Sequence, residues 1–206
     1  MRRARRRSAA ADRSRLVYVV LHGLVVGASI AINGTCFTVT NVAKDAFSVD
    51  AVDATLQVTN IKFIQEGSRV NLERSSHLGA EVGGHVIAGH VAGMASILAF
   101  TKTHPGARIE IELLKDLGKY VFDKGFLAVN GASLTVASFD ADSSRAGINL
   151  IPETLRMMNF ADYSVGDALN IEIDSQTRTL VDTMEGVLDR LNIPSDRPRR
   201  SSSSFI

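Results

Sequence analysis

The sequence of 206 residues contains a single cysteine, Cys36, and no tryptophan. One cysteine excludes an intrachain disulfide, and it also excludes a metal site built from several thiolates. No apolar run reaches the roughly 18 residues that a membrane helix needs. The longest candidate, residues 16–32, is broken by His22 and by glycines. We therefore expect neither a disulfide-stapled protein nor a protein that spans or binds a membrane.

A marked excess of charge is also absent, because the net charge is only +1 at pH 7. Residues 1–15 hold seven arginines, however, and residues 196–206 hold three. Between these ends lie 13 basic and 20 acidic side chains, and such an acidic body argues against a nucleic-acid partner. Residues 1–15 and 192–206 are predicted to be disordered. The Arg-rich leader is typical of an organelle presequence, although a start placed on unrelated upstream sequence is the favoured interpretation.

Two stretches of the chain repeat each other. Residues 31–42 (AINGTCFTVTNV) and 128–139 (AVNGASLTVASF) lie 97 residues apart and share an Asn-Gly pair and a Thr-Val pair. Two further blocks recur in the same order at an offset of 99. These blocks are 50–56 with 149–155, and 67–73 with 166–172. Three blocks in one order indicate a duplicated module, with two extra residues in the second copy.

Most of the body is predicted to be β-structure. Short segments rich in Val, Ile, Thr and Phe follow one another, and Asn33-Gly34 and Asn130-Gly131 are type I′ turn signals between paired strands. Such spacing predicts small closed barrels, which we assign to residues 16–80 and 81–178. Apolar residues at helical spacing then predict a C-terminal helix over residues 179–191.

The first copy is expected to be incomplete. The second copy opens with residues 83–97, whose counterparts in the first would precede Met1. Residues 14–20 can stand in for the strand that follows. The first barrel is therefore predicted to lack its first strand.

The two copies differ at positions where a reacting group would matter. Cys36 in the first copy corresponds to Ser133 in the second. His90 lies in the segment that the first copy lacks, and Lys124 and Asp174 are near the second copy only. Two like sites with unlike side chains suit two similar molecules that are bound face to face and treated differently.

Structural interpretations compete with these roles. A lone cysteine on a strand is usually a small buried hydrophobe. Asp174 could serve only to anchor the start of the helix, and Asn33 and Asn130 are turn formers whatever else they contact. Among the remaining histidines, His85 is expected to be structural.

Several blocks in order resemble the riboflavin synthase family of lumazine-binding proteins, over about residues 21–191: GASIAINGTCFTVTNV, GGHVIAGHV, KGFLAVNGASLTV, LIPETLRMMNF and LNIEIDSQTRTLVDTMEGVL. The resemblance implies an all-β fold of two tandem six-stranded Greek-key barrels plus a C-terminal α-helix, assembled as a homotrimer through that helix. It implies a transferase that converts two molecules of 6,7-dimethyl-8-ribityllumazine into riboflavin and 5-amino-6-ribitylaminouracil by four-carbon transfer. No cofactor or metal is implied.

The same resemblance assigns site residues, and the family's working site lies between neighbouring subunits. The residues it assigns to catalysis are His90, Cys36, Ser133, Lys124 and Asp174. Those it assigns to substrate binding in the N-terminal half are Ser29, Cys36, Phe37, Thr38, Asp50, Ala51, Val52, Asp53, Ala54 and Thr55. Those in the C-terminal half are Gly89, His90, Val91, Lys124, Ser133, Leu134, Thr135, Asn149, Leu150, Ile151, Pro152, Glu153 and Thr154.

Two departures from the family pattern leave alternatives open. The opening Met-Phe-Thr-Gly-Ile strand is absent, and Asn130 stands where an acid is expected beside the second turn glycine. The alternatives to the enzyme are a non-catalytic lumazine- or flavin-binding protein of the antenna type and an inactive truncated synthase. The side chains retained in the second copy favour the enzyme. We expect a cytoplasmic location, or organellar import if the leader is a presequence, and lumazine synthase as a candidate partner.

Overall fold

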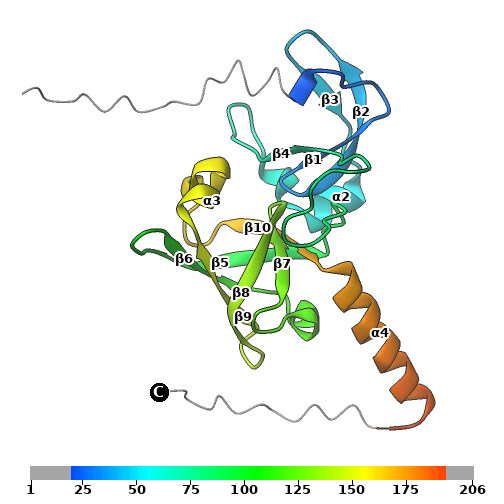
Figure 1. Cartoon of the computed structure of the whole chain (residues 1–206), viewed down its shortest axis with the longest axis vertical. Helices are drawn as coiled ribbons and strands as arrows, with labels where there is room; N and C mark the ends of the chain where they lie inside the picture. The colour runs from blue at the N-terminus through cyan, green and yellow to red at the C-terminus, as the bar shows by residue number, and fades with distance from the viewer. Residues whose placement is uncertain (1–19, 194–206) are drawn as a thin grey trace, which may run out of the picture.

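The computed structural model describes residues 20–193, which form two β modules and a C-terminal helix (Figure 1). The first module is a four-stranded sheet in the order β3-β2-β1-β4, and the second is a closed barrel in the order β10-β5-β6-β9-β8-β7. The strands are β1 (Ser29–Ile32), β2 (Thr35–Val42), β3 (Phe47–Val49), β4 (Leu72–Arg74), β5 (Gly93–Lys102), β6 (Ala107–Glu112), β7 (Phe126–Val129), β8 (Ala132–Asp140), β9 (Arg145–Leu150) and β10 (Ala168–Ile173). The helical segments are α2 (Asp53–Val58), η1 (Asn60–Phe63), η2 (Lys115–Tyr120), α3 (Pro152–Met157), η3 (Asn159–Asp162) and α4 (Ser175–Arg190). The expected mostly β fold with a C-terminal helix is confirmed.

The duplication extends to the register of the strands. In the β1–β2 hairpin Ala31 lies opposite Cys36, and in the β7–β8 hairpin Ala128 lies opposite Ser133. The third strand joins each hairpin across an equivalent bulge, and β4 pairs with β1 as β10 pairs with β7. The order β3-β2-β1-β4 therefore reproduces β9-β8-β7-β10 strand for strand.

Within residues 20–80 the first module is an open four-stranded sheet, whereas the sequence led us to expect a barrel that lacks only its first strand. In the second module β5 and β6 lie between β10 and β9 and close the sheet on itself. Among residues 20–80 no strand takes these two places, so β3 and β4 remain edges of an open sheet. Of residues 14–20, expected to supply a strand, only Val20 belongs to the described part, and it is helical, as is Leu21 after it.

The two hydrophobic cores differ in size for the same reason. In the barrel, the inward side chains of all six strands meet, including fully buried Ile97, Ile109 and Leu127. The core of the open sheet is built on Leu24, Ile30, Phe37 and Val39. Since burial of apolar area is the main favourable term in folding, the barrel supplies most of the stability.

The two Asn-Gly turns have the backbone that the sequence predicts. Asn33 and Gly34 have φ values of 46° and 74°, and Asn130 and Gly131 have 47° and 84°, as a type I′ turn requires. The two turns meet tip to tip between the modules. A Cβ atom on Gly34 would lie 2.4 Å from the backbone nitrogen of Gly131, so the contact admits only glycine.

A network of asparagines, buried except for half-buried Asn71, joins the modules around this contact. Asn71 and Asn170 occupy equivalent positions, and each crosses to the turn of the other module. The Asn71 Nδ2 donates to the Asn130 carbonyl at 3.1 Å, and the Asn170 Nδ2 donates to the Asn33 carbonyl at 2.9 Å. Their backbone nitrogens donate to the side chains of Asn33 and Asn130, at 2.9 and 2.8 Å. The network thus has a pseudo-two-fold axis.

A second pair of asparagines obeys the same symmetry. The backbone nitrogen of Asn60 donates to the Asn170 Oδ1 at 2.6 Å, and that of Asn159 donates to the Asn71 Oδ1 at 3.0 Å. The Asn60 Nδ2 donates to the Ala168 carbonyl, and the Asn159 Nδ2 donates to the equivalent carbonyl in the first module, both at 3.0 Å. Because each buried polar group needs a partner from the other module, these bonds fix the two modules in one arrangement.

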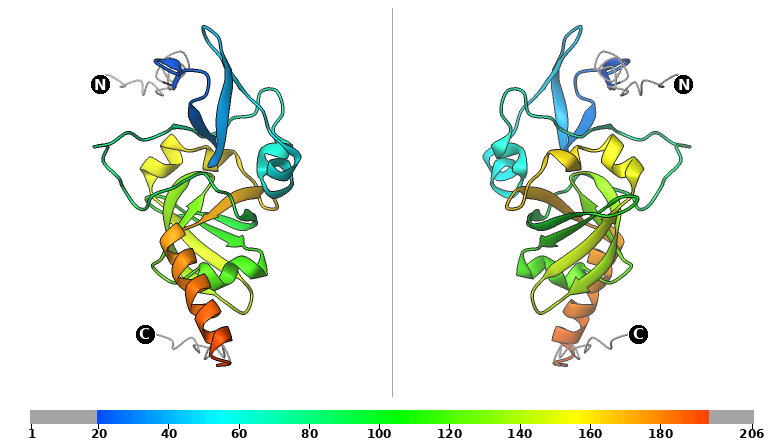
Figure 2. Two further views of the ribbon diagram at one scale, coloured as in Figure 1. Left: turned by 90° about the vertical axis from the view of Figure 1, so that its right-hand side faces the viewer. Right: turned by 90° about the vertical axis from the view of Figure 1, so that its left-hand side faces the viewer.

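The terminal helix α4 begins at Ser175, four residues before the start expected at 179. The Asp174 carboxylate is the N-cap and accepts hydrogen bonds from the Thr177 backbone nitrogen and hydroxyl, at 2.9 and 2.7 Å. Tyr120 of η2 donates to Asp182 at 2.5 Å and holds the helix against the barrel. Both side views show α4 extending away from the barrel (Figure 2). No residue of α4 is buried.

Candidate active site

The predicted reacting positions lie on the outer faces of the two equivalent hairpins. Along β2, Cys36 and Thr38 are exposed, whereas Phe37 between them is buried in the core. Along β8, Ser133 is half-buried and Thr135 is exposed, on the face opposite the barrel interior. This alternation follows from the two-residue period of a strand. The side chains of Phe37 and of its counterpart Leu134 point into the cores, so only the backbone of these two residues can contact a ligand.

The linker between the modules, residues 75–92, passes over both hairpins. The Gly89 carbonyl accepts a hydrogen bond from the Cys36 backbone nitrogen at 3.0 Å. A Cβ atom on Gly89 would lie 2.6 Å from the Cys36 Cβ, and one on Gly84 would lie 2.2 Å from the Ser133 Oγ. Both glycines have positive φ. The linker thus approaches Cys36 and Ser133 closely because glycine stands at both places.

A buried carboxylate anchors this linker to the barrel. Glu172 is 7% exposed, and its two oxygens accept hydrogen bonds from the backbone nitrogens of Ala88 and Gly89, at 2.8 and 3.0 Å. Its counterpart in the first module, Glu73, is exposed. Partial desolvation of the carboxyl group, together with the negative charge of Glu172, raises the pKa of Glu73.

The linker also brings His85 onto Ser133. The His85 Nδ1 lies 2.6 Å from the Ser133 Oγ, and the His85 backbone nitrogen donates to the same oxygen at 3.1 Å. The imidazole stacks on Phe126, with ring centroids 5.2 Å apart. Burial lowers the pKa of His85, while the charges of Asp174 and Glu172 raise it. The arrangement is a hydroxyl–imidazole pair with two carboxylates near the imidazole, a geometry suited to proton transfer.

The sequence analysis did not place His85 in the site and took it to be structural. Its contact with Ser133 spans 48 positions of the chain, so the sequence alone does not reveal it. The signal was present in the segment GGHVIAGHV, which carries two histidines five residues apart. The Nε2 of His85 is buried and has no hydrogen-bond partner among the described residues.

The residues assigned to catalysis are only partly brought together. Ser133 and Asp174 lie around His85, and Cys36 lies at the other end of the linker. His90 and Lys124 are exposed, and neither side chain has a hydrogen bond or ion pair within the described part of the chain. Lys124 has a φ of 65° in the turn before β7.

The remaining residues assigned to substrate binding form two equivalent strips. Asp50 to Thr55 run from the end of β3 into α2, and Asn149 to Thr154 run from the end of β9 into α3. Ser29 begins β1, opposite Thr38. Leu150 is buried in the barrel, so only its backbone is available there.

Other kinds of site were searched for over residues 20–193. No group of three or more His, Cys, Asp or Glu side chains is arranged there to hold a metal ion. Within the same range, no helix has the length and apolar composition to cross a membrane.

Comparison with known proteins decides the family. A family model for the lumazine binding domain matches the chain twice, over residues 6–75 and 88–174. The chain belongs to the lumazine-binding domain family. The two matches correspond to the two copies of the repeat, and within the described residues they cover the open sheet and the barrel.

Curated relatives give a more specific likeness. The chain is 38% identical to riboflavin synthase of Escherichia coli (strain K12) over 170 residues, which are 82% of this chain and 79% of that protein. It is 37% identical to riboflavin synthase of Chlamydia pneumoniae over 165 residues, 80% of each chain. Among solved structures, LumP complexed with 6,7-dimethyl-8-(1'-D-ribityl) lumazine is similar with a TM-score of 0.67 and 21% identity, covering 75% of this chain and 82% of that one. That structural likeness supports the shared fold.

Proposed function

We propose that this lumazine-binding chain is a riboflavin synthase, a transferase that converts two molecules of 6,7-dimethyl-8-ribityllumazine into riboflavin and 5-amino-6-ribitylaminouracil. The observation that carries the proposal is the 38% identity to a riboflavin synthase over 82% of the chain. The duplicated site supports it, because the reaction needs two like molecules that play different parts.

The chemical step starts with loss of a proton from the C7 methyl group of one lumazine. The resulting anion is delocalised over the substrate's own rings, so the protein supplies orientation and proton transfer. Ser133 and His85 form the pair suited to accept the proton. In the working tautomer Nδ1 of His85 is unprotonated and takes the hydroxyl proton as Ser133 takes the substrate proton. Asp174 and Glu172 stabilise the imidazolium that forms.

The first module binds the second lumazine without an equivalent base. Cys36 occupies the position of Ser133, but the linker presents Gly89 to it and no histidine. This difference suits a module that orients a substrate while the proton is removed at the other site. His90 and Lys124 are exposed on the linker and on the β7 turn, and we assign them to contacts with substrate across a subunit boundary.

We further propose a homotrimer held by α4, with the working site between the first module of one subunit and the barrel of its neighbour. Leu180 and Met184 are one helical turn apart and are 65% and 51% exposed in the single chain. Val181 packs on the barrel core, so α4 has a second apolar face available for other subunits. A cytoplasmic or organellar location and association with lumazine synthase stay predictions from the sequence.

The test uses the purified chain and dimethylribityllumazine as the only substrate. Riboflavin should be detected by its absorption and fluorescence, with one pyrimidine released per riboflavin and no added metal or nucleotide. Tight lumazine binding without riboflavin would leave the antenna-type alternative in place of the enzyme. Absence of both binding and turnover would favour the inactive-synthase alternative.

A further inference from the structure

Part of the linker, residues 84–89, connects the two equivalent hairpin positions directly, and we call this segment the strap. Near its start, the backbone nitrogen and the Nδ1 of His85 contact the Ser133 Oγ, at 3.1 and 2.6 Å. At its end, the Gly89 carbonyl accepts a hydrogen bond from the Cys36 backbone nitrogen at 3.0 Å. The Cα atoms of His85 and Gly89 are four residues apart, which is at most about 14 Å. A short piece of backbone therefore joins the imidazole at the second hairpin to the cysteine of the first.

The imidazole of His85 has little besides the strap to hold it in place. It stacks on Phe126 and contacts Ser133, but its Nε2 is buried without a hydrogen-bond partner among the described residues. A functional histidine is commonly oriented by a hydrogen bond at its second ring nitrogen. Because the described residues supply none, the backbone of the strap decides where the imidazole lies.

The other end of the strap is packed tightly on Cys36. Gly89 is buried, and a Cβ atom on it would lie 2.6 Å from the Cys36 Cβ and 2.8 Å from the Cys36 nitrogen. The backbone nitrogen of Gly89 donates to Glu172 at 3.0 Å, and that of Ala88 donates to the same carboxylate at 2.8 Å. A displacement at Cys36 therefore moves Gly89 relative to the carboxylate that anchors it.

Glu172 relates such a displacement to His85. Burial lowers the pKa of His85, and the negative charges of Asp174 and Glu172 raise it. Glu73 of the first module lies close enough to Glu172 for the charge of Glu172 to contribute to its raised pKa. Because one carboxylate both binds the end of the strap and acts on the imidazole, a shift of the strap changes the position of His85 and the charge around it.

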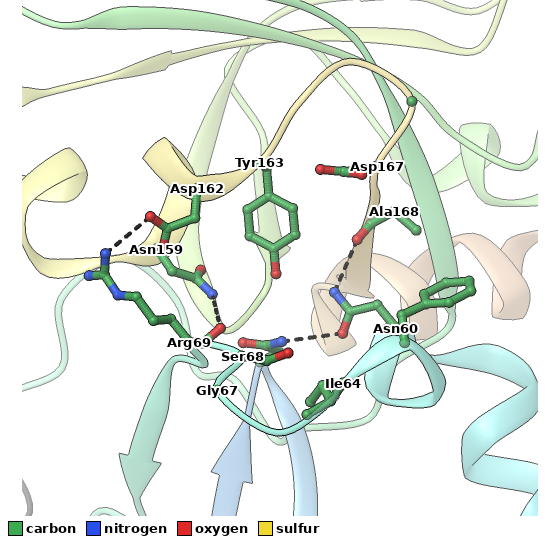
Figure 3. A pocket seen from close by; sticks show the side chains of 13 residues that line it. Asn60, Ile64, Gly67, Ser68, Arg69, Asn159, Asp162, Tyr163, Asp167 and Ala168 are labelled. Atoms are coloured by element: carbon green, nitrogen blue, oxygen red, sulfur yellow. Dashed lines mark hydrogen bonds and ion pairs between the residues drawn. The ribbon is translucent and has the colours of Figure 1, made fainter.

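The two modules are not free to turn and absorb the displacement. Figure 3 shows the side chains of Asn60 and Asn159, each bonded at 3.0 Å to a carbonyl of the other module, beside a cavity of about 660 Å³. No residue of the strap lines that cavity. The strap is therefore a separate connection between the modules, and a displacement at one end has to be taken up within the strap.

We propose that Gly89 is a positioning residue for the Ser133–His85 pair: it lies on Cys36 of the first module, and its place there holds the imidazole at hydrogen-bond distance from Ser133 in the second. The two hairpin positions are thereby coupled within one chain. The coupling itself needs no substrate. Its consequence for catalysis, that a ligand at one hairpin adjusts the base at the other, rests on the proposed riboflavin synthase activity.

Gly89→Ala tests the coupling from the Cys36 end, because the added Cβ does not fit against Cys36 and the strap must shift. Hydrogen exchange at the His85 amide of the full chain should accelerate at least about tenfold. The NMR titration of the His85 imidazole, whose signal is identified by its loss in His85→Gln, should shift as well. Gly79→Ala is the matched control: its φ is 86° against 79° for Gly89, but its added Cβ would meet no atom within 4 Å. If both measurements agree between the two variants, the proposal is overturned.

The reverse measurement keeps the proposal testable if the first variant does not fold. Cys36 is the single cysteine, so the thiol reagent DTNB reports on it alone. Coupling between two positions is reciprocal, so Ser133→Ala, which frees the His85 end of the strap, should raise the rate of thiol modification at least about fivefold. Ser138→Ala makes the same change farther along β8, where the hydroxyl accepts from Arg108, and is the control.

Equal rates of thiol modification in the two serine variants would refute the coupling. Neither measurement uses a lumazine. A chain that shows the coupling but forms no riboflavin would therefore overturn the proposed function and support the positioning role of Gly89.

Discussion

Single side chains distinguish the two equivalent positions of the duplicated hairpin. Ser133 has a histidine at hydrogen-bond distance, whereas Cys36 has the backbone of Gly89. Both positions have the same cross-strand partner, an alanine, so the scaffold is equivalent and the chemistry is not. The proton-accepting role is therefore assigned to the second module.

The Ser133–His85 pair predicts non-additive kinetics. His85→Ala and Ser133→Ala should each lower the rate of riboflavin formation by about 10²-fold or more, and the double variant should lose little further. His90→Ala in the Ser133→Ala background should add its own loss, because His90 has no bond to Ser133. The measurement is initial rate with saturating dimethylribityllumazine. Additive losses for His85 and Ser133 would show that the two residues act separately.

The same pair predicts an acid limb in the pH–rate profile. The imidazole must be neutral to accept a proton, so the rate is retained above the pKa of His85 and lost as pH falls through it. Burial lowers this pKa from the ordinary value of 6.5, so the limb should lie on the acid side of that value. The limb should be absent in His85→Gln. A profile unchanged by that substitution would contradict the role.

Cys36→Ser should be mild, because the equivalent hairpin position already holds a serine. We expect a change in rate of less than about tenfold, which corresponds to under about 1.4 kcal/mol in the barrier. Cys36→Ala removes the thiol without adding a polar group, and it serves as the comparison. A loss as large as that of His85→Ala in the serine variant would indicate a chemical role for the thiol itself.

At the scale of elements, carboxylates position two segments: Glu172 anchors the linker and Asp174 caps the start of α4. The Asn-Gly turns and the helix cap at Asp174 were foreseeable, because each is a local signal within a few residues. Glu172 was not, because its partners lie 84 and 83 positions earlier in the chain. Glu172 stands at a polar position of the alternating segment ALNIEI, where the sequence gives no sign that it is buried.

Glu172→Gln should loosen the linker, because an amide oxygen accepts from the two backbone nitrogens less strongly than a carboxylate. Hydrogen exchange at the Ala88 and Gly89 amides should accelerate, with a stability loss of about 1–3 kcal/mol. Glu73→Gln is the matched control, since Glu73 holds the equivalent position on β4 and is exposed. If the Ala88 and Gly89 amides exchange in Glu172→Gln as slowly as in the unsubstituted chain, the anchoring role is excluded.

The apolar face of α4 predicts self-association. Leu180→Asp would place a charge in the contact between subunits, and the molar mass by light scattering should fall from that of a trimer to that of one chain. The unfolding temperature of the barrel should change little, since Leu180 is 65% exposed in the single chain. Thr179→Asp, at an exposed position about 100° around the helix from Leu180, is the control. An unchanged mass in Leu180→Asp would rule out α4 as the trimer contact.

At the scale of the whole molecule, repeated sequence blocks were enough to predict the duplication and its class of fold. They could not predict how the copies face each other, because the bonds of Asn71 and Asn170 run between modules. Closure of the first module could not be judged from the repeat, because it needs two strands beyond the four that residues 20–80 supply. The period of apolar residues shows which face of a strand is buried. Whether a sheet closes into a barrel depends on which of its edge strands pair, and the period does not show that.

The asparagine network predicts that the modules unfold together. Asn170→Ala removes the acceptor for the Asn60 backbone nitrogen and the donor to the Asn33 carbonyl, leaving both unpaired. Each unpaired group costs about 1–3 kcal/mol, and calorimetry should show a lower and broader transition as the small module uncouples. Asn41→Ala, at an exposed position on β2, should leave the transition unchanged. An unaltered single transition in Asn170→Ala would refute the coupling.

The tip-to-tip contact of the two turns also bears on the chemical lifetime of the protein. Asparagine followed by glycine is prone to deamidation, because the unhindered backbone nitrogen attacks the side-chain amide and releases ammonia. Here Asn33 and Asn130 are 2% and 0% exposed, and their side chains are held by hydrogen bonds. The folded junction withholds both amides from that cyclisation, whereas each excursion to the unfolded chain exposes them. An aspartate formed at Asn33 would carry a buried charge into the junction and oppose refolding, so the contact between the turns also slows the chemical ageing of the protein.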